Sequence, residues 1–344
     1  MQTLTISKPD DFHLHLRDGA AMASIVNYSA AQFSRAIVMP NLKPAITTVD
    51  MALSYRERIL GSVDEKYNFE PLMTLYLTDN MLPDVINIAA QTESIKALKY
   101  YPAGATTNSD CGVTDIKKIY SVLEAMMKNE LPLLIHGEVS DIEVNVFDRE
   151  KVFIEKVLEP LVDDFCELKI VFEHITTKAA VDFVLNASSN VAATITPQHI
   201  LLNRNDLFNE SFRPHNYCFP VLKEEDDRLA VLDAATSGNS KFFLGTDSAP
   251  HSRSKKESGC GCAGIFSAYN ALELYVEIFD NQNKLDEVEA FTSFFGADFY
   301  GLNRNHEKIT LVKKETHIPE ALPFGDDKLV PLRAGDTCSW QVKF

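Results

Sequence analysis

Two histidines, His13 and His15, stand two residues apart near the start of the chain, in a run of β-forming residues. Side chains two apart on a strand point to the same face, so both imidazoles can reach one metal ion. Phe12, Leu14 and Leu16 are then expected on the opposite face. Imidazole nitrogen is a common ligand for zinc and related metals. Two buried histidines held only by hydrogen bonds are the alternative that this spacing leaves open.

Further candidate ligands lie at the ends of other β-rich runs or just after them: Lys99, His136, His174 and Asp247. Each has an ordinary alternative, such as an exposed histidine or an aspartate that caps a turn. A fold that gathers these strand ends at one opening would bring histidines, an aspartate and a lysine together. That set suits two metal ions that share a site, where water becomes a nucleophile near neutral pH.

Lys99 requires a separate explanation, because an ammonium group cannot bind a cation. A lysine with a lowered pKa can react with carbon dioxide, and the resulting carbamate has two oxygens that can bridge two metals. A lysine paired with a carboxylate at the mouth of the site is the alternative. The residue types leave both interpretations open.

Apolar, β-rich runs predict the strands that position these residues. The predicted strands are 11–16, 35–39, 69–75, 94–101, 131–136, 168–173, 190–196 and 241–245. Between most of them lie segments with helical periodicity, such as 114–129 and 177–188, with Thr114 and Thr177 as expected N-caps. Alternating strands and helices are typical of a parallel (β/α)8 barrel of the TIM type, an α/β fold with its chemistry at the C-terminal strand ends.

One domain, residues 1–344, is expected because no linker rich in glycine, serine or proline divides the chain. From about Ile318 a proline-containing tail, strand-like at 339–344, is expected to pack on the barrel as a small C-terminal extension.

The net charge of −16 argues against nucleic-acid binding, since the protein would repel phosphates. An anionic substrate would therefore need local positive charge. No apolar run reaches the roughly 18 residues of a membrane span and no signal segment is recognisable, so a cytoplasmic location without membrane attachment is expected. The six cysteines are too sparse for a disulfide scaffold.

The chain resembles, essentially from end to end, the dihydroorotase family of the amidohydrolase superfamily, in its monofunctional bacterial form. The motifs that carry the resemblance are Asp-Asp-Phe-His-Leu-His-Leu-Arg-Asp at 10–18, Val-Met-Pro-Asn-Leu at 38–42, Lys-Tyr-Tyr-Pro-Ala-Gly-Ala-Thr-Thr-Asn-Ser at 99–109, Ile-His-Gly-Glu at 135–138, Phe-Glu-His-Ile at 172–175, Gly-Thr-Asp-Ser-Ala-Pro-His at 245–251 and Lys-Glu-Ser-Gly-Cys-Gly-Cys-Ala-Gly at 256–264.

The resemblance implies a zinc-dependent cyclic amide hydrolase of pyrimidine biosynthesis, which reversibly cyclises N-carbamoyl-L-aspartate to (S)-dihydroorotate. It implies two zinc ions, one held by His13, His15 and Asp247 and the other by His136 and His174. Lys99, carboxylated to N6-carboxylysine, and a hydroxide would bridge the metals. Asp247 would also be the general acid and base. The resemblance further implies a homodimer.

Substrate contacts are implied for His15, Arg17, Asn41, Thr106, Thr107, His136, Phe219, His251 and Ala263. Arg17 lies two residues beyond His15 on the same expected strand face and can hold a carboxylate with two parallel hydrogen bonds. Surface pairing of Arg17 with Asp18 is the alternative. The main chain at 219 and 263 would also bind the substrate. Phe219 departs from the leucine of the family pattern. Thr106 and Thr107 belong to segment 103–111, whose small and hydroxyl residues suit a mobile lid or, alternatively, a plain solvated loop.

Two patterns near 260 carry no cofactor prediction. Residues 259–264 match G-x-G-x-x-G but follow a polar loop, whereas a dinucleotide fingerprint follows a strand directly. Cys260 and Cys262 lack a second cysteine pair, so a structural zinc site is not expected there.

Two other functions compete with the dihydroorotase hypothesis. A hydantoinase-like cyclic amidase would share the metal ligands but would not need Arg17 and Asn41 to bind a carboxylate on the ring. A barrel that serves only as an assembly scaffold would be expected to lack ligands, and none of the candidates is missing here.

Overall fold

The computed structural model describes residues 2–259 and 261–343. Eight parallel strands pair in chain order around a nearly closed barrel. They are β2 (Asp10–Leu14), β3 (Arg35–Val38), β4 (Glu70–Tyr76), β5 (Ile95–Tyr100), β6 (Leu133–Ile135), β7 (Ile170–Phe172), β8 (Val191–Ile195) and β9 (Phe242–Leu244). Leu14 and Ser248 form a parallel bridge that brings the segment after β9 back to β2. The predicted α/β barrel is thus confirmed, with each strand end within two residues of its expected position.

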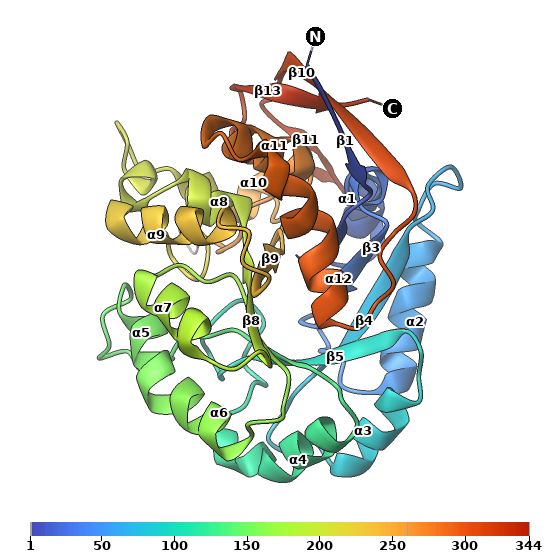
Figure 1. The fold of residues 1–344 in the computed structure, drawn as a ribbon, viewed down its shortest axis with the longest axis vertical. Helices are drawn as coiled ribbons and strands as arrows, with labels where there is room; N and C mark the ends of the chain where they lie inside the picture. The colour runs from blue at the N-terminus through green and yellow to red at the C-terminus, as the bar shows by residue number, and fades with distance from the viewer. Residues whose placement is uncertain (1, 260, 344) are drawn as a thin grey trace.

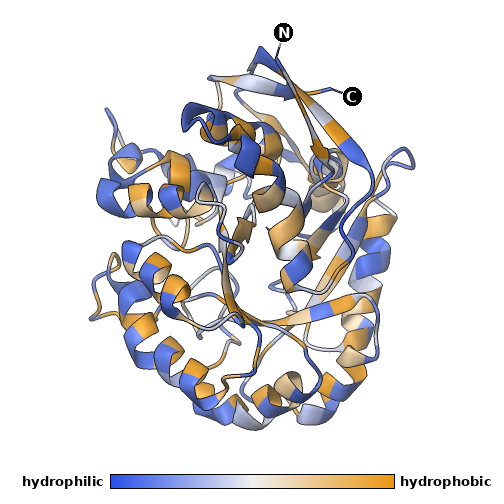
Figure 2. Ribbon diagram, in the orientation of Figure 1, coloured by the Kyte–Doolittle hydropathy of each residue, from blue (hydrophilic) through white to orange (hydrophobic). Residues whose placement is uncertain are grey.

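Helices surround the barrel (Figure 1). They are α1 (Gly19–Gln32), α2 (Val49–Leu60), α3 (Pro83–Ala90), α4 (Tyr120–Lys128), α5 (Arg149–Phe153), α6 (Glu159–Asp164), α7 (Lys178–Asn186), α8 (Pro197–Leu201), α9 (Glu225–Ala235), α10 (Arg253–Lys256), α11 (Ala271–Asn281) and α12 (Phe295–Phe299). In Figure 2 the outer helices carry both orange and blue residues, as expected of helices with one buried and one exposed face. The main hydrophobic core lies between these helices and the strands.

The barrel interior contains a separate apolar layer with one residue from each strand: Phe12, Ile37, Leu72, Ala97, Leu134, Val171, Ala192 and Phe243. Because side chains alternate along a strand, the next interior position on β5 is Lys99 and on β7 is Glu173. The apolar layer is therefore the floor of the site above it.

The expected position of Phe12 is wrong. Leu14 and Leu16 do pack in the outer core, opposite the histidines, but Phe12 belongs to the interior layer. The pairing of β2 with β3 is irregular between Asp11 and Leu14. A bulge of this kind breaks the two-residue period, so that the consecutive residues Phe12 and His13 both face the interior.

Helix starts were predicted with mixed success. Thr177 caps α7, with its hydroxyl accepting from the Ala180 amide. Thr114 is not a cap, because its hydroxyl donates to Asp79 instead. Asp115 caps a short 3-10 turn, Ile116–Ile119, which precedes α4.

The extension outside the barrel is larger than the predicted tail. It is a three-stranded antiparallel sheet in the order β1 (Thr3–Ser7), β10 (Lys308–His317) and β13 (Thr337–Val342), with a separate hairpin of β11 (Leu322–Phe324) and β12 (Asp327–Leu329). Both chain ends lie beside this sheet (Figure 1). The sequence-based prediction missed the pairing of β1 with β10 because its partners are about as far apart in the chain as possible. Within the described residues, no helix has the length and apolar character needed to cross a membrane.

Candidate active site and metal centre

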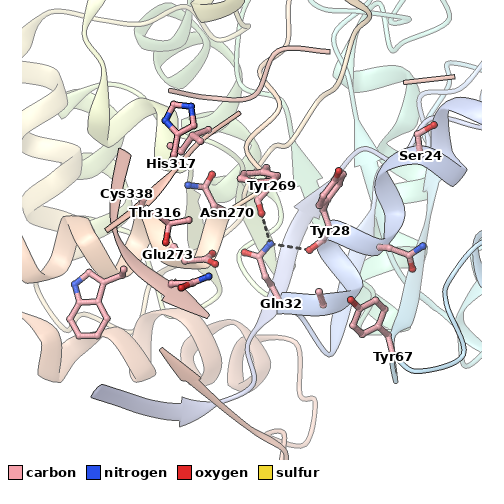
Figure 3. A pocket seen from close by; sticks show the side chains of 15 residues that line it. Ser24, Tyr28, Gln32, Tyr67, Tyr269, Asn270, Glu273, Thr316, His317 and Cys338 are labelled. Atoms are coloured by element: carbon pink, nitrogen blue, oxygen red, sulfur yellow. Dashed lines mark hydrogen bonds between the residues drawn. The ribbon is translucent and has the colours of Figure 1, made fainter. Parts of the chain in front are cut away.

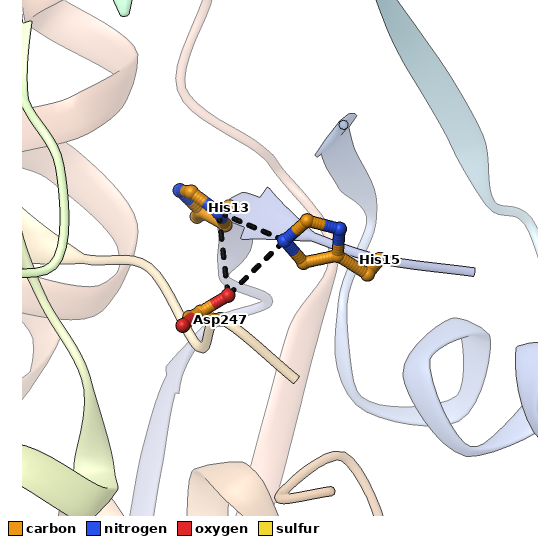
Figure 4. Close-up of side chains that lie close together, drawn as sticks. All are labelled: His13, His15 and Asp247. Carbon is orange, nitrogen blue, oxygen red and sulfur yellow. Dashed lines mark hydrogen bonds and ion pairs between the residues drawn. The ribbon is translucent and has the colours of Figure 1, made fainter. Parts of the chain in front are cut away.

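Three predicted ligands converge at the C-terminal end of the barrel (Figure 4). The Nε2 atoms of His13 and His15 lie 3.2 Å apart, and Oδ1 of Asp247 lies 3.4 Å from the first and 3.1 Å from the second. All three side chains are buried, and their ligand atoms lie within 4.8 Å of one another. These residues form a group that could hold a metal ion.

Nδ1 of each of these two imidazoles already has a hydrogen-bond partner. His13 Nδ1 lies 2.7 Å from Glu173 Oε2, and His15 Nδ1 lies 2.9 Å from Asn41 Oδ1. Both partners are acceptors, so each imidazole carries its proton on Nδ1 and turns a lone pair on Nε2 towards Asp247. Two lone pairs and a carboxylate oxygen this close together repel one another unless a cation lies between them. The arrangement therefore fits a metal ion bound by Nε2 of each imidazole, with each Nδ1 hydrogen-bonded to an acceptor.

The second histidine pair lies beside the first. His136 Nδ1 and His174 Nε2 are 3.2 Å apart, and His136 Nε2 donates to Glu138 Oε2 at 3.0 Å. The ring centroids of His13 and His174 are only 5.0 Å apart. The structure therefore gathers four histidines from the ends of β2, β6 and β7 in one cluster.

Lys99 is fully buried on β5, and its Nζ has no hydrogen-bond partner among the described residues. The ring of Tyr101 is near, with its centroid 5.2 Å from Nζ. Burial lowers the pKa of Lys99 to about 8, although the charges of Glu173 and Asp247 oppose the change. A buried amine without a bonded carboxylate fits carboxylation better than the ion-paired alternative, because the neutral amine is the form that reacts with carbon dioxide.

The charges of the cluster suit metal binding. Burial lowers the pKa of His13, His15 and His174, which leaves these imidazoles neutral. Burial raises the pKa of Asp247, but its surroundings outweigh burial and bring that pKa down to about 2, which keeps the carboxylate ionised. Neutral imidazoles and an ionised carboxylate are the protonation states that coordinate zinc-like metals.

Residues at the strand ends adopt a strained backbone. His174 and Asp247 each have a φ of 42°, and Arg17 has a φ of 61°, in the left-handed region that favours glycine. Such conformations cost roughly 1–3 kcal/mol each and cluster at functional sites. Because of this turn, two consecutive residues, Glu173 and His174, both face the cluster.

Arg17 lies at the rim of the same cavity. Its Nε donates to the Pro250 carbonyl at 2.9 Å and its Nη2 to His251 Nε2 at 3.1 Å. The guanidinium has five N–H donors, so these two bonds leave donors for a ligand carboxylate. The alternative pairing with Asp18 is not what the structure shows, because Asp18 pairs with Arg58.

The predicted lid segment lies over the cluster. Asn41 Nδ2 donates to the Thr107 carbonyl at 3.1 Å, and Thr107 Oγ1 donates to the Ala263 carbonyl at 3.3 Å. Thr106, Phe219 and the residues just named line the cavity together with the histidines. The free space in this cavity is only about 20 Å³, so the site is narrow.

Glu173 and its neighbours are functional candidates to which the sequence assigned no role. Thr194 Oγ1 donates to Glu173 Oε2 at 2.5 Å and accepts from the His174 amide. Asp11 Oδ2 accepts from Thr246 Oγ1 at 2.6 Å, which ties β2 to the segment that carries Asp247. Alternation along the predicted strand 168–173 was the available signal for Glu173, because it places residue 173 on the same face as residue 171.

The two rejected patterns near 260 have structural explanations. Gly261 and Gly264 follow helix α10 rather than a strand, and a Cβ on Gly264 would lie 2.4 Å from the Ala249 carbonyl oxygen. Close packing of backbone, not cofactor binding, therefore requires that glycine. Cys260 lies outside the described residues, and Cys262 is a free, partly buried thiol.

A larger cavity of about 450 Å³ lies between α1, α11 and strands β10 and β13 (Figure 3). Tyr28, Tyr269, Asn270 and Glu273 are part of its lining. Among the described residues, none of the predicted site residues lines it, so size alone does not locate the active site.

Known proteins are similar to this chain over its whole length. The dihydroorotase of Microcystis aeruginosa is 61% identical over 342 residues, which cover 99% of this chain and 99% of that protein. A crystal structure of dihydroorotase from Saccharomyces cerevisiae, in complex with 5-fluoroorotic acid, matches with a TM-score of 0.92 and 35% identity, covering 100% of this chain and 99% of that chain. The L-hydantoinase of Arthrobacter aurescens matches with a TM-score of 0.80 at 14% identity, over 98% of this chain and 82% of that one, which shows a shared fold alone. No protein-family model matches the chain.

Proposed function

The chain belongs to the dihydroorotase family, whose cyclic amide hydrolases interconvert N-carbamoyl-L-aspartate and (S)-dihydroorotate in pyrimidine biosynthesis, and we propose how its own residues carry out that reaction. The hydantoinase and scaffold hypotheses are set aside, since the identity to dihydroorotases extends over the whole chain. The observation that carries the mechanism is the convergence of His13, His15 and Asp247 beside an unpaired, buried Lys99.

Two zinc ions would be held as follows. His13, His15 and Asp247 would bind one, and His136 and His174 the other, with N6-carboxylated Lys99 as the bridging ligand. The donor set fits, because two ring nitrogens face each other at 3.2 Å in each histidine pair. They are Nε2 of His13 and Nε2 of His15 in one pair, and Nδ1 of His136 and Nε2 of His174 in the other. When bound, the metals supply Lewis acidity for the amide carbonyl and lower the pKa of water at the site.

Arg17, Asn41 and His251 would bind the substrate carboxylate, with the main chain at Phe219 and Ala263. The free guanidinium donors of Arg17 supply the positive charge that an anionic substrate needs in a protein of net charge −16. The yeast dihydroorotase, crystallised with 5-fluoroorotic acid, accepts a ring of the same kind that carries a carboxylate.

Asp247 would move the proton. In ring opening, water adds to the ring amide carbonyl, and the Asp247 carboxylate accepts its proton. Asp247 then passes that proton to the ring nitrogen as the carbon–nitrogen bond breaks. Cyclisation follows the same steps in reverse. Because Oδ1 faces Nε2 of His13 and His15, where the metal would be held, Oδ2 is the oxygen left for this transfer.

Segment 103–111 would open to admit the substrate and close over it. The free space in the cavity is too small for dihydroorotate, and side-chain hydrogen bonds of Asn41 and Thr107 hold the segment in place. Such bonds break at modest cost, about 0.5–1.5 kcal/mol each. A homodimer, which the family resemblance implies, and a cytoplasmic location, which the sequence analysis led us to expect, complete the proposal.

An ultraviolet assay of dihydroorotate consumption, run with and without a chelator, tests the proposed function. We expect turnover that the chelator abolishes and added zinc, cobalt or manganese restores. Purified protein that consumes no dihydroorotate after metal loading would refute the substrate. Turnover that persists in protein shown to be metal-free would refute the metal chemistry.

A further inference from the structure

Lys256, the last residue of α10, is a buried cation to which the mechanism assigns no role. Its side chain is only 4% exposed. Nζ donates to the Tyr217 carbonyl at 2.8 Å and to the Gly264 carbonyl at 2.6 Å. Two backbone carbonyls are therefore the bonded partners of this ammonium, rather than a carboxylate.

The two segments that Lys256 joins both line the active-site cavity. Phe219 lies two residues after Tyr217, and Ala263 directly precedes Gly264. The Gly264 amide also donates to the Tyr217 carbonyl, at 2.9 Å. The Tyr217 carbonyl thus accepts from both the Gly264 amide and the Lys256 ammonium. These bonds hold the two loops together at the positions where their main chain is expected to bind the substrate.

Burying a charged ammonium costs free energy unless its positive charge makes a favourable interaction. Burial lowers the pKa of Lys256 to about 8, with only partial compensation from the thiols of Cys218 and Cys262. The charge lies near the carboxylate site, because Lys256 bonds the carbonyl of Gly264 and a Cβ on Gly264 would lie 2.9 Å from the His251 ring. Consistent with this, Lys256 contributes, after burial and Arg17, to the lowered pKa of His251. A neutral side chain could bond the carbonyls but could not add this positive potential.

We propose that Lys256 is a positioning residue for substrate binding: its ammonium fixes the backbone at Phe219 and Ala263 and, in addition to Arg17, supplies a positive charge near His251. This inference rests on the proposed function, because it concerns the same carboxylate. It adds a role for the conspicuous lysine of the 256–264 motif, which neither binds metal nor touches the reacting atoms.

Steady-state kinetics of Lys256→Met with dihydroorotate, beside Lys255→Met, test the proposal. Lys255 is the matched control because it is the adjacent lysine and its side chain is exposed. For Lys256→Met we expect KM to rise roughly tenfold or more, with kcat and bound metal close to wild type, because the chemistry itself is untouched. Lys255→Met should match wild type in KM, kcat and bound metal.

Lys256→Gln separates the two contributions, because the amide keeps N–H donors but has no charge. A KM between those of wild type and Lys256→Met is expected. If Lys256→Met does not fold, the KM of Lys256→Gln relative to Lys255→Met decides instead.

Two results would overturn the role of Lys256. One is a wild-type KM in the folded variant, and the other is a parallel loss of kcat and metal, which would mark a general structural role. Failure of the proposed function is distinguishable, because then the wild-type protein itself would not consume dihydroorotate.

Discussion

Nδ1 of His13 lies 2.7 Å from Oε2 of Glu173, a carboxylate that directly precedes His174 in the chain. The end of β7 thus supplies one imidazole to the cluster and, one residue earlier, the acceptor that orients an imidazole from β2. Thr194 of β8 donates to the same oxygen. The geometry of His13 therefore depends on two other strands of the barrel.

Glu173→Gln should weaken metal binding without unfolding the protein. The amide preserves size but not charge, so it holds the His13 imidazole less firmly and makes it a poorer ligand. Loss of such a partner typically costs 10–100-fold in metal affinity or activity. Competition with a chromophoric chelator measures the affinity, with the exposed Glu167→Gln as control. Equal metal retention in the two variants would show that Glu173 has no part in the site.

Lys99→Met should lose activity by on the order of 10³-fold or more, because it removes the oxygens that the proposed carboxylated Lys99 would offer to the metals. Metal analysis should show reduced occupancy, and short carboxylic acids such as acetate should restore part of the rate. Wild-type rates for Lys99→Met without any added acid would refute the bridging role.

Arg17→Met should raise KM for dihydroorotate by roughly 10²-fold, because charge-assisted hydrogen bonds to a carboxylate are lost. Turnover at saturation should fall much less. Arg304→Met, which removes an arginine exposed on the surface, is the control. An unchanged KM in Arg17→Met would mean that another group binds the carboxylate.

Glu273 makes the stability depend on pH at a site far from the chemistry. Glu273 is only 8% exposed, its Oε2 has no partner among the described residues, and burial raises its pKa from 4.5 to about 7 (Figure 3). Between these two values the folded protein binds more protons than the unfolded chain. Its contribution to stability therefore falls as pH rises through that window and is constant above about 7.

Glu273→Gln should remove this dependence. The free energy of unfolding of the variant, relative to wild type, should increase by about 3 kcal/mol between pH 4.5 and 7.5. Urea unfolding at several pH values measures it, with the exposed Glu315→Gln as control. A difference that stays constant with pH would show that Glu273 titrates normally.

The strand order and most candidate ligands could be predicted because their signals are local. Apolar β-rich runs located each barrel strand, and His136, His174 and Asp247 follow those runs directly. The barrel geometry then requires that strand ends meet, so their convergence could be inferred before any distance was known.

The errors and omissions have a common physical origin in contacts between distant residues. The hydroxyl of Thr114 suited a helix cap, but Asp79, which is 35 residues away, binds it. The pairing of β1 with β10, across almost the whole chain, left no local trace in the sequence. Glu173 stands in a motif, yet its partner His13 is 160 residues away.

The sequence by itself determined which chemistry is available: imidazoles, an aspartate and a lysine at strand ends, with an arginine two residues beyond His15. Only the tertiary structure decided which atoms meet. The bulge in β2 places His13 in the interior beside Phe12, and left-handed backbone turns His174 and Asp247 inward. Register, bulges and hydrogen bonds between strands arise when the barrel closes, so a pattern of residue types does not specify them.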